Sequence, residues 1–292
     1  MRIAITGANS GIGLRAAGLL AAEGHHVLAL CRNVDRLRTA VKTLPDEHRR
    51  CIEPVELDLA ASASIRRAAA QIVQAGPLDA LINNAAVFDL TVRTPRVTAD
   101  GHELFWATNH LGPTELTARL SPALAAAADP RVVFVASKGL VTMPRIAIRF
   151  DELDSTRWFT PTAAYYHAKL AQVMTAVTIA ERVSDVLDVS CLRVPTVRLD
   201  PARLAAQPRI LRALYAPKNR LAKTPEDIAQ VYDRIVTGPA RHARGADVYL
   251  DENLRQVPLP RFARHRDHRD LLWRMTAAAT GEPDWAWPLS GR

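Results

Sequence analysis

Thr6-Gly7-Ala8-Asn9-Ser10-Gly11-Ile12-Gly13 stands between a short apolar run, residues 1–5, and an Ala/Leu-rich run, residues 14–23. The first run predicts a buried strand and the second a helix. In a strand–turn–helix unit, Gly7 permits the tight turn, Gly11 lets the backbone approach a pyrophosphate, and Gly13 lets the helix pack closely on the strand. The free N–H groups and the positive end of the helix dipole then face the anion. The stretch therefore predicts a dinucleotide site, with Asn9, Ser10 and Ile12 beside the three glycines.

The charge of the chain indicates a solvated surface. The 292 residues carry a formal net charge of +8, and the basic residues are mostly arginines spread along the chain, with a richer tract at residues 261–274. No aromatic-interleaved basic patch or recognition motif accompanies them, so we expect no nucleic-acid partner. Hydrophobic residues make up 48% of the sequence, which is enough for a sizeable core.

The apolar and cysteine patterns indicate a cytoplasmic protein. No apolar run approaches the length of a membrane span, and the first strand begins so early that no signal peptide is expected. Cys31, Cys51 and Cys191 are scattered and match no metal-ligand spacing. We expect them to be small apolar core residues, and we expect no metal site.

Strand and helix patterns alternate along the chain, which is typical of a doubly wound parallel sheet. After the first strand, further strands are predicted at residues 26–31, 52–57, 78–82, 131–136, 187–193 and 246–250. Helices are predicted at 35–44, from about 62, at 100–127, at 160–183, and from about 200 and 224. The sequence therefore predicts a single α/β domain over residues 1–292, a Rossmann fold with a seven-stranded, mostly parallel sheet.

The end of the second strand predicts the type of dinucleotide. Cys31 is followed there by Arg32 and Asn33, where a site for the unphosphorylated cofactor places an acidic side chain on the ribose 2′-hydroxyl. An arginine offers a planar cation to a 2′-phosphate instead. The pattern favours NADP(H), and the alternative is a surface arginine that happens to follow a strand.

Two further strand ends contribute candidate cofactor contacts. Asp58 and Leu59 follow the third strand, and Asp58 either accepts a hydrogen bond from an adenine amino group or caps the helix near Ser62. Asn83 and Ala85 follow the fourth strand, where small residues suit a crevice against a flat ligand. Asn83 alternatively ties neighbouring strands together.

Tyr165 and Lys169 are four residues apart on one predicted helix, so their side chains share a face. A phenol has an ordinary pKa of about 10, and a nearby ammonium lowers it. Tyr165 then becomes an acid for a carbonyl that is reduced, or a base for an alcohol that is oxidised. Ser137, at the end of the fifth strand, is placed to hydrogen-bond the substrate oxygen, and Asn109 to anchor a water near Lys169. Taken singly, each is also read as an ordinary helix-face, cap or interface residue.

Together these motifs resemble the short-chain dehydrogenase/reductase family. The resemblance rests on the Thr6–Gly13 stretch with its GxxxGxG spacing, Asn83-Asn84-Ala85, Asn109, Ser137 and Tyr165-x-x-x-Lys169. Cys31-Arg32-Asn33, residues 108–112 and residues 163–171 are similar to the retinol-dehydrogenase-like branch. The resemblance implies a nicotinamide cofactor and catalysis by Asn109, Ser137, Tyr165 and Lys169. It also implies that Tyr165, Lys169, Pro195 and Val197 contact the cofactor, and that homodimers or homotetramers form through the helices of Asn109 and Tyr165.

The chain departs from the family pattern at two places. After the sixth strand it has Pro195-Thr196-Val197 where the family commonly has Pro-Gly, and Leu199 and Asp200 cannot supply the hydroxyl expected next. Lys138 follows Ser137 directly, and points either to solvent or to the mouth of the pocket.

The substrate is predicted to be a bulky hydrophobic small molecule. The family places a substrate lid after the sixth strand, here about residues 200–223, where apolar residues recur at helical spacing. The same residues fit an amphipathic helix that packs on the body. Phe88, Met143 and Trp158 are expected near the substrate, and a helical tail is expected at about 262–292.

The sequence is compatible with three functions. The first is an NADP-dependent short-chain dehydrogenase/reductase that interconverts a carbonyl and an alcohol, with Tyr165 as acid or base. The second is an NADP-bound enzyme that catalyses a non-reductive step such as cyclisation or dehydration. The third is a catalytically silent NADP-binding regulator, against which the intact Asn109, Ser137, Tyr165 and Lys169 argue.

Overall fold

A computed structural model describes residues 1–153, 157–198, 222–281 and 285–287 of the chain. Its strands form one seven-stranded sheet in the order β3-β2-β1-β4-β5-β6-β7, and every neighbouring pair is parallel. The strands are β1 (Arg2–Thr6), β2 (His26–Cys31), β3 (Ile52–Glu56), β4 (Ala80–Asn83), β5 (Arg131–Ser137), β6 (Asp188–Val194) and β7 (Tyr249–Leu250). The predicted Rossmann-type sheet is confirmed.

The strand order reverses between β1 and β4, because β2 and β3 lie on one side of β1 while β4 to β7 lie on the other. Loops that leave neighbouring strands at this point diverge to opposite faces of the sheet and open a crevice at the carboxyl edge. The glycine turn after β1 lies at this crevice.

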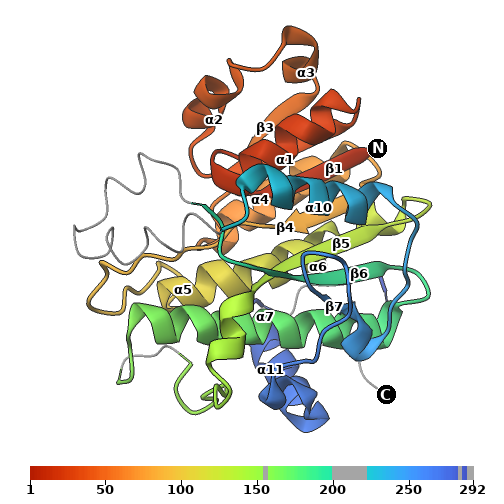
Figure 1. The fold of residues 1–292 in the computed structure, drawn as a ribbon. Coiled ribbons are helices and arrows are strands. Elements are labelled where there is room, and N and C mark those ends of the chain that lie inside the picture. Colours follow the sequence, from red (N-terminus) through yellow and green to blue (C-terminus); the bar gives the residue numbers. More distant parts are fainter. Residues whose placement is uncertain (154–156, 199–221, 282–284, 288–292) are drawn as a thin grey trace.

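Helices cover both faces of the sheet (Figure 1). α1 (Gly11–Ala22) and α10 (Pro225–Thr237) pack side by side on one face, next to α2 (Val34–Val41) and the short α3 (Asp46–Arg50). α4 (Ser62–Gln74), α6 (Gly112–Ala125) and α7 (Pro161–Val183) cover the other face, and α11 (Arg266–Ala279) packs on α7. Each face therefore has its own hydrophobic core, and the sheet lies between the two.

The capping residues explain where two of the site-bearing helices begin. Pro161 and Pro225 occupy the first position of α7 and α10, where a missing N–H costs nothing. Thr160 accepts a hydrogen bond from the backbone N–H of Ala163, and Thr224 forms a capping box with Asp227. The predicted helix at 160–183 thus begins at Pro161 and places Tyr165 in its second turn.

The helix predicted over 100–127 is wrong at its start. Gly101 has a φ of +85°, and the backbone N–H of Thr98 donates to the carbonyl of His102, so residues 98–102 form a turn. The first regular helix is α5 (Leu104–Trp106), followed by a π-helical turn at Ala107–Leu111 and then α6. A hydrophobic period does not reveal a π turn, although such turns mark functional sites in many helices.

Strand β7 and helix α3 also differ from the prediction. Residues 245–248 form a 3₁₀ turn, so β7 is limited to Tyr249–Leu250 instead of 246–250. The short helix α3 follows Pro45 and was not predicted; it begins with two acidic residues and ends with two arginines, which suits the helix dipole.

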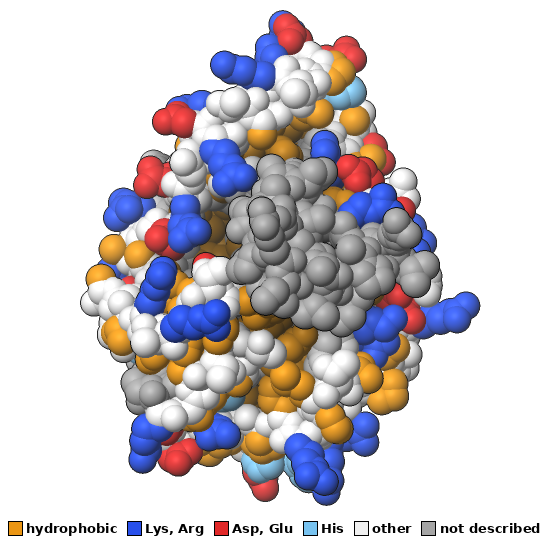
Figure 2. Space-filling view, turned by 60° about the vertical axis from the view of Figure 1, so that its left-hand side comes forward, with side chains coloured by type: hydrophobic (Ala, Val, Ile, Leu, Met, Phe, Trp, Pro, Cys, Tyr) orange, Lys and Arg blue, Asp and Glu red, His pale blue; other side chains and the backbone are white. Residues whose placement is uncertain are grey.

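The surface agrees in part with the prediction that the basic residues are solvated. Lys and Arg side chains are scattered over the face drawn in Figure 2. Within the basic tract, however, Arg269 is buried and donates to Glu181 and to the carbonyls of Ala263 and Arg264, so this arginine belongs to the fold.

Several predictions on localisation and organisation remain predictions. Among the described residues, no helix is both long and apolar enough to cross a bilayer. The lid predicted at 200–223 lies outside the described residues, except for its last two positions. Cytoplasmic localisation, the single domain and the homo-oligomer also stay predictions.

Candidate active site

The glycine turn after β1 leaves no room for side chains. Gly7 has a φ of +72°, and its backbone N–H donates to the carbonyl of Leu30 at 2.8 Å, which ties the turn to β2. A Cβ at Gly13 would lie 2.5 Å from the Gly7 carbonyl oxygen and 2.7 Å from Nδ2 of Asn84. Gly13 is therefore the residue that lets α1 pack directly on the turn, as the sequence predicted.

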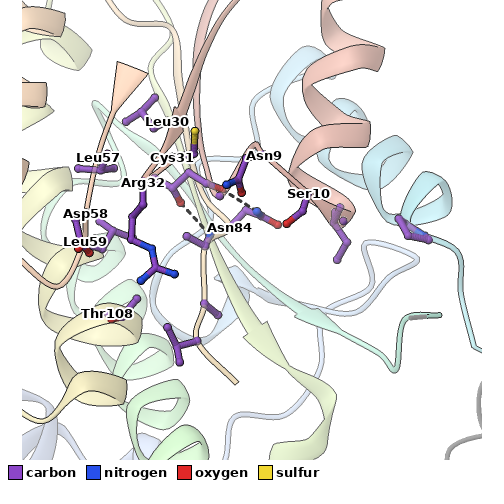
Figure 3. A pocket seen from close by; sticks show the side chains of 18 of the residues that line it. Asn9, Ser10, Leu30, Cys31, Arg32, Leu57, Asp58, Leu59, Asn84 and Thr108 are labelled. Carbon is purple, nitrogen blue, oxygen red and sulfur yellow. Dashed lines mark hydrogen bonds between the residues drawn. The ribbon is translucent and has the colours of Figure 1, made fainter. Parts of the chain in front are cut away.

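A pocket of about 330 Å³ opens above this turn, between the glycine residues on one side and the end of β3 on the other (Figure 3). Ten of the predicted cofactor-binding residues line it: Gly7, Asn9, Ser10, Gly11, Ile12, Arg32, Asp58, Leu59, Ala85 and Val197. Its glycine residues and its place at the start of α1 suit the binding of a dinucleotide.

Arg32 follows β2 and projects into this pocket, on the side lined by Asp58, Leu59 and Thr108 (Figure 3). Asn33, in contrast, caps α2, because its Oδ1 accepts from the backbone N–H of Arg36 at 2.7 Å. Asn33 and Arg32 line a neighbouring pocket, so Arg32 contributes to two pockets.

Asp58 does not cap α4. Its Oδ1 accepts from the backbone N–H of Ala60 at 2.9 Å, and its own N–H donates to Oγ of Ser64. The residue that precedes α4 is Ala61, which has no capping side chain. Of the two sequence interpretations of Asp58, the helix cap is therefore wrong, and the side chain remains at the pocket.

Asn83 does not line the pocket. It is fully buried, and its Nδ2 donates to Oγ1 of Thr117 on α6 at 3.0 Å, so it fixes the helix to the sheet. Asn84 lines the pocket instead, where its Nδ2 donates to the carbonyl of Thr6 at 2.7 Å and its Oδ1 accepts from Tyr232 on α10. Successive residues of a strand point to opposite faces, so only one member of the pair can reach the crevice.

A second pocket of about 430 Å³ adjoins the first and contains two of the four predicted catalytic residues. Ser137, at the end of β5, and Tyr165, on α7, both line it. Pro195, Thr196 and Val197 form its wall on the side of β6, and Val197 lines both pockets. The two pockets therefore meet at Val197.

The phenol of Tyr165 is held in its protonated form. Burial raises its pKa above the ordinary value, Tyr166 raises it further, and a hydrogen bond with Ser137 opposes the rise. The predicted lowering by Lys169 is therefore not seen in this arrangement. A protonated phenol beside a serine hydroxyl can donate a proton to a carbonyl oxygen placed between them.

Lys169 lies beneath the pocket and not in its wall. Its Nζ donates to the carbonyl oxygen of Val135 at 2.6 Å and to Oε1 of Gln172 at 2.9 Å, and it lies 5.9 Å from the centre of the Tyr165 ring. Burial lowers the pKa of this ammonium to about 8. Gln172 was not predicted from the sequence, although it lies three residues after Lys169 and thus on the same face of α7.

Asn109 lies in the π-helical turn and is fully buried. Its Oδ1 accepts from the backbone N–H of Val87 at 2.7 Å, and its Nδ2 donates to the carbonyl of the same residue at 2.9 Å. It thus fixes the segment after β4, which lines the cofactor pocket at residues 84–87. Within the described residues its side-chain contacts are to this segment rather than to Lys169.

The expected apolar contacts of the substrate divide between two places. Phe88 lines the pocket of Tyr165, and the two ring centres are 4.5 Å apart. Met143 and Trp158 instead line a separate hollow beside His167, so the prediction that they lie near the substrate is wrong for this arrangement. Leu90 and Tyr166, which the sequence analysis did not select, complete the apolar side of the Tyr165 pocket.

The chain resembles known proteins in both sequence and structure. A family model described as short chain dehydrogenase matches residues 1–148. Human retinol dehydrogenase 14 is 31% identical over 254 residues, which cover 81% of this chain and 74% of that protein. Human retinol dehydrogenase 13 is 36% identical over 184 residues, 62% of this chain and 54% of that protein, so the match spans about half of its length.

Solved structures share the fold at lower sequence identity. An uncharacterised protein from Mycobacterium paratuberculosis has a TM-score of 0.70 at 24% identity, covering 97% of this chain and 94% of that chain. A short chain dehydrogenase from Escherichia coli CFT073, in complex with NADPH, has a TM-score of 0.64 at 24% identity, covering 86% and 95%. The sequence matches confirm the resemblance to the retinol-dehydrogenase-like branch.

Proposed function

Because this chain belongs to the short-chain dehydrogenase/reductase family, in the branch that includes the retinol dehydrogenases, we propose that it is an NADP(H)-dependent oxidoreductase. Its substrate is a bulky, largely hydrophobic small molecule on which it interconverts a carbonyl and an alcohol. The observation that carries the proposal is the meeting of two pockets at Val197, one with a glycine turn and the other with Ser137 and Tyr165.

The preference for NADP(H) rests on Arg32. This residue occupies the position where an acidic side chain would bind a ribose 2′-hydroxyl, and a guanidinium binds phosphate through parallel N–H groups. The E. coli structural relative was solved with NADPH, which agrees with this preference. When bound, the cofactor supplies the hydride.

The residues of the chain perform the proton transfer. Tyr165 donates its phenolic proton to the carbonyl oxygen as the alcohol forms. Its raised pKa means that the phenol carries this proton at neutral pH, although it is a weaker acid than a free phenol. Ser137 donates a hydrogen bond to the same oxygen, where negative charge develops. Phe88, Leu90 and Tyr166 supply the apolar lining against which the substrate body packs.

The proposal is tested by following NADPH absorbance with a panel of hydrophobic aldehydes and ketones. We expect NADPH to be consumed with at least one of them, and NADH to be used far less well. Conversion of a substrate without any change in nicotinamide absorbance would contradict a redox function and favour the non-reductive alternative. Binding of NADPH without turnover of any panel member would favour the silent regulator.

A further inference from the structure

Lys138 is the charged residue among the described residues that line the Tyr165 pocket. It follows Ser137 directly and begins a short 3₁₀ turn, Lys138–Thr142, in which Ser137 Oγ accepts from the backbone N–H of Gly139 at 3.2 Å. The Cα atoms of consecutive residues are about 3.8 Å apart. The backbone of Lys138 is therefore held next to Ser137 by the end of β5.

The ammonium of Lys138 has one acidic neighbour across the pocket edge. Its Nζ lies 3.3 Å from Oε1 of Glu252, and the two side chains are 47% and 15% exposed. This distance is longer than the roughly 2.7–2.9 Å of a strong charge-assisted hydrogen bond. An ammonium has three donors, so one contact to Glu252 leaves capacity for a ligand.

Glu252 holds the lysine beside the pocket without closing it. It lies in the tight turn after β7, in which the backbone N–H groups of Asn253 and Arg255 donate to Oδ1 of Asp251. Its second carboxylate oxygen, Oε2, is buried and has no hydrogen-bond partner among the described residues. This turn is held by its own hydrogen bonds, and from it Glu252 pairs with Lys138, which lines the pocket.

A wholly apolar substrate suits this site poorly. The rest of the wall near Lys138 includes Phe88, Leu90 and Val194, and a substrate that fills the pocket displaces water from it. Loss of that water destabilises an ammonium unless another polar group replaces it. A carboxylate on the substrate replaces that water and accepts hydrogen bonds from the ammonium donors that the single contact with Glu252 does not use.

We propose that Lys138 determines substrate specificity by binding a carboxylate, so that the substrate is an amphipathic acid with an apolar body. The reacting carbonyl lies between Ser137 and Tyr165, and the carboxylate lies at the pocket edge next to Lys138. The inference rests on the proposed function, since it describes the substrate of the same pocket.

The test compares two probes of nearly equal size, para-formylbenzoate and its methyl ester. Both carry an aldehyde on an aromatic ring, and only the first carries a negative charge. Their affinities for the NADP⁺ complex are measured by titration calorimetry, and their reduction is measured by NADPH oxidation. We expect the wild-type protein to bind the acid about tenfold more tightly than the ester, as one hydrogen-bonded charge pair predicts.

Three variants sharpen the comparison. Lys138→Met keeps the length of the side chain and removes its charge, so the acid-to-ester affinity ratio should fall to about one. Glu252→Gln removes the competing carboxylate and should raise the ratio. Lys42→Met changes an exposed lysine at the end of α2 and should leave the ratio unchanged.

The inference is overturned if wild type binds the two probes equally, or if Lys138→Met leaves the ratio unchanged. The proposed function fails separately, because its failure appears as the absence of NADPH oxidation across the whole panel of aldehydes and ketones, while the affinity ratio is measured without turnover.

Discussion

The cofactor pocket and the substrate pocket share one edge of the sheet, yet they are built from different parts of the chain. The floor of the cofactor pocket is backbone: the glycine turn is bonded to Leu30, and the Thr6 hydroxyl accepts from the backbone N–H of Ala85 at 2.9 Å. The wall of the substrate pocket is made of side chains from separate segments, such as Phe88, Thr142 and Tyr166.

This difference affects how readily each site is found from the sequence and how well it tolerates substitution. A backbone site requires glycines at fixed spacing, so it leaves a pattern in the sequence and tolerates little substitution. A side-chain site leaves no spacing, because its residues come from loops and helices far apart in the chain. The predictions below test whether the two pockets behave in these two ways, from the largest expected effect to the smallest.

The largest effect is expected at the point where the pockets meet. Tyr165→Phe removes the proton donor and keeps the ring, so the rate of NADPH-dependent reduction should fall by about 10³-fold. Cofactor binding should survive, since the phenyl ring keeps its contact with Phe88. Steady-state kinetics and fluorescence titration with NADPH measure the two quantities, and a residual rate within a few-fold of wild type would exclude Tyr165 as the acid.

The backbone character of the cofactor pocket is tested by two glycines of the same helix. Gly13→Ala places a Cβ 2.5 Å from the Gly7 carbonyl oxygen, so we expect it to destabilise the fold by about 1–3 kcal/mol and to weaken NADPH binding. Gly18→Ala meets only Leu44 methyl groups at 3.5 Å and should stabilise α1 by up to about 1 kcal/mol.

Chemical denaturation and NADPH titration of both variants give the result. Opposite signs for Gly13→Ala and Gly18→Ala would support a floor that admits no Cβ. Equal and small effects would show that α1 can move away from the turn, and that the glycine spacing is not required by packing.

Arg32 contributes a side chain to the cofactor pocket, whose floor is backbone. Arg32→Gln should weaken NADPH binding by about ten- to a hundredfold through loss of a charge-assisted phosphate contact, while NADH binding stays constant. The ratio of the two dissociation constants is the measurement. Arg67→Gln, an exposed arginine on α4, is the control, and an equal loss for both cofactors with Arg32→Gln would contradict a role in reading the phosphate.

The smallest effect is expected beneath the substrate pocket, at Gln172. Burial lowers the pKa of Lys169 to about 8, so the ammonium is charged below this pH and loses its proton above it. The charged ammonium, 5.9 Å from the centre of the Tyr165 ring, favours the phenolate that proton transfer leaves behind, so we expect kcat/KM for reduction to decline as the pH rises through about 8. A carboxylate favours the charged ammonium, so Gln172→Glu should move the decline up by about one pH unit.

Gln172→Leu removes the acceptor that lies 2.9 Å from Nζ and should move the decline to lower pH. The exposed Gln71→Glu serves as the control and should leave the pH profile in place. Two Gln172 variants with the wild-type profile would show that Lys169 does not set the pH dependence.

The sequence predicted the fold well because its signals are local. Strand β2 and helix α7 match their predicted ranges closely, since apolar runs and the Thr160-Pro161 start define them directly. The start of α5 at Leu104 was missed because Gly101 and Glu103 end the preceding turn through backbone geometry and a capping hydrogen bond that a hydrophobic period does not encode.

The candidate site was predicted less completely, because the sequence does not reveal which way a side chain points or which groups it hydrogen-bonds. Asn83 and Asn84 are adjacent, and the strand pleat decides which one faces the crevice. Lys169 was expected beside the phenol, but its choice of the Val135 carbonyl and Gln172 depends on how α7 packs on β5. The positions of Met143 and Trp158 depend on the course of the chain between β5 and α7, which no residue spacing in the sequence predicts.

A crystal structure with NADP⁺ bound tests the central claim most directly, by the distance from the Tyr165 hydroxyl to the reactive carbon of the nicotinamide ring. We predict that the ring lies beside Val197, where the two pockets meet, with the hydroxyls of Tyr165 and Ser137 on its hydride-accepting side and within reach of a common substrate oxygen. A nicotinamide ring that lies outside this junction, or a Tyr165 hydroxyl turned away from it, would contradict the assignment of Tyr165 as the proton donor.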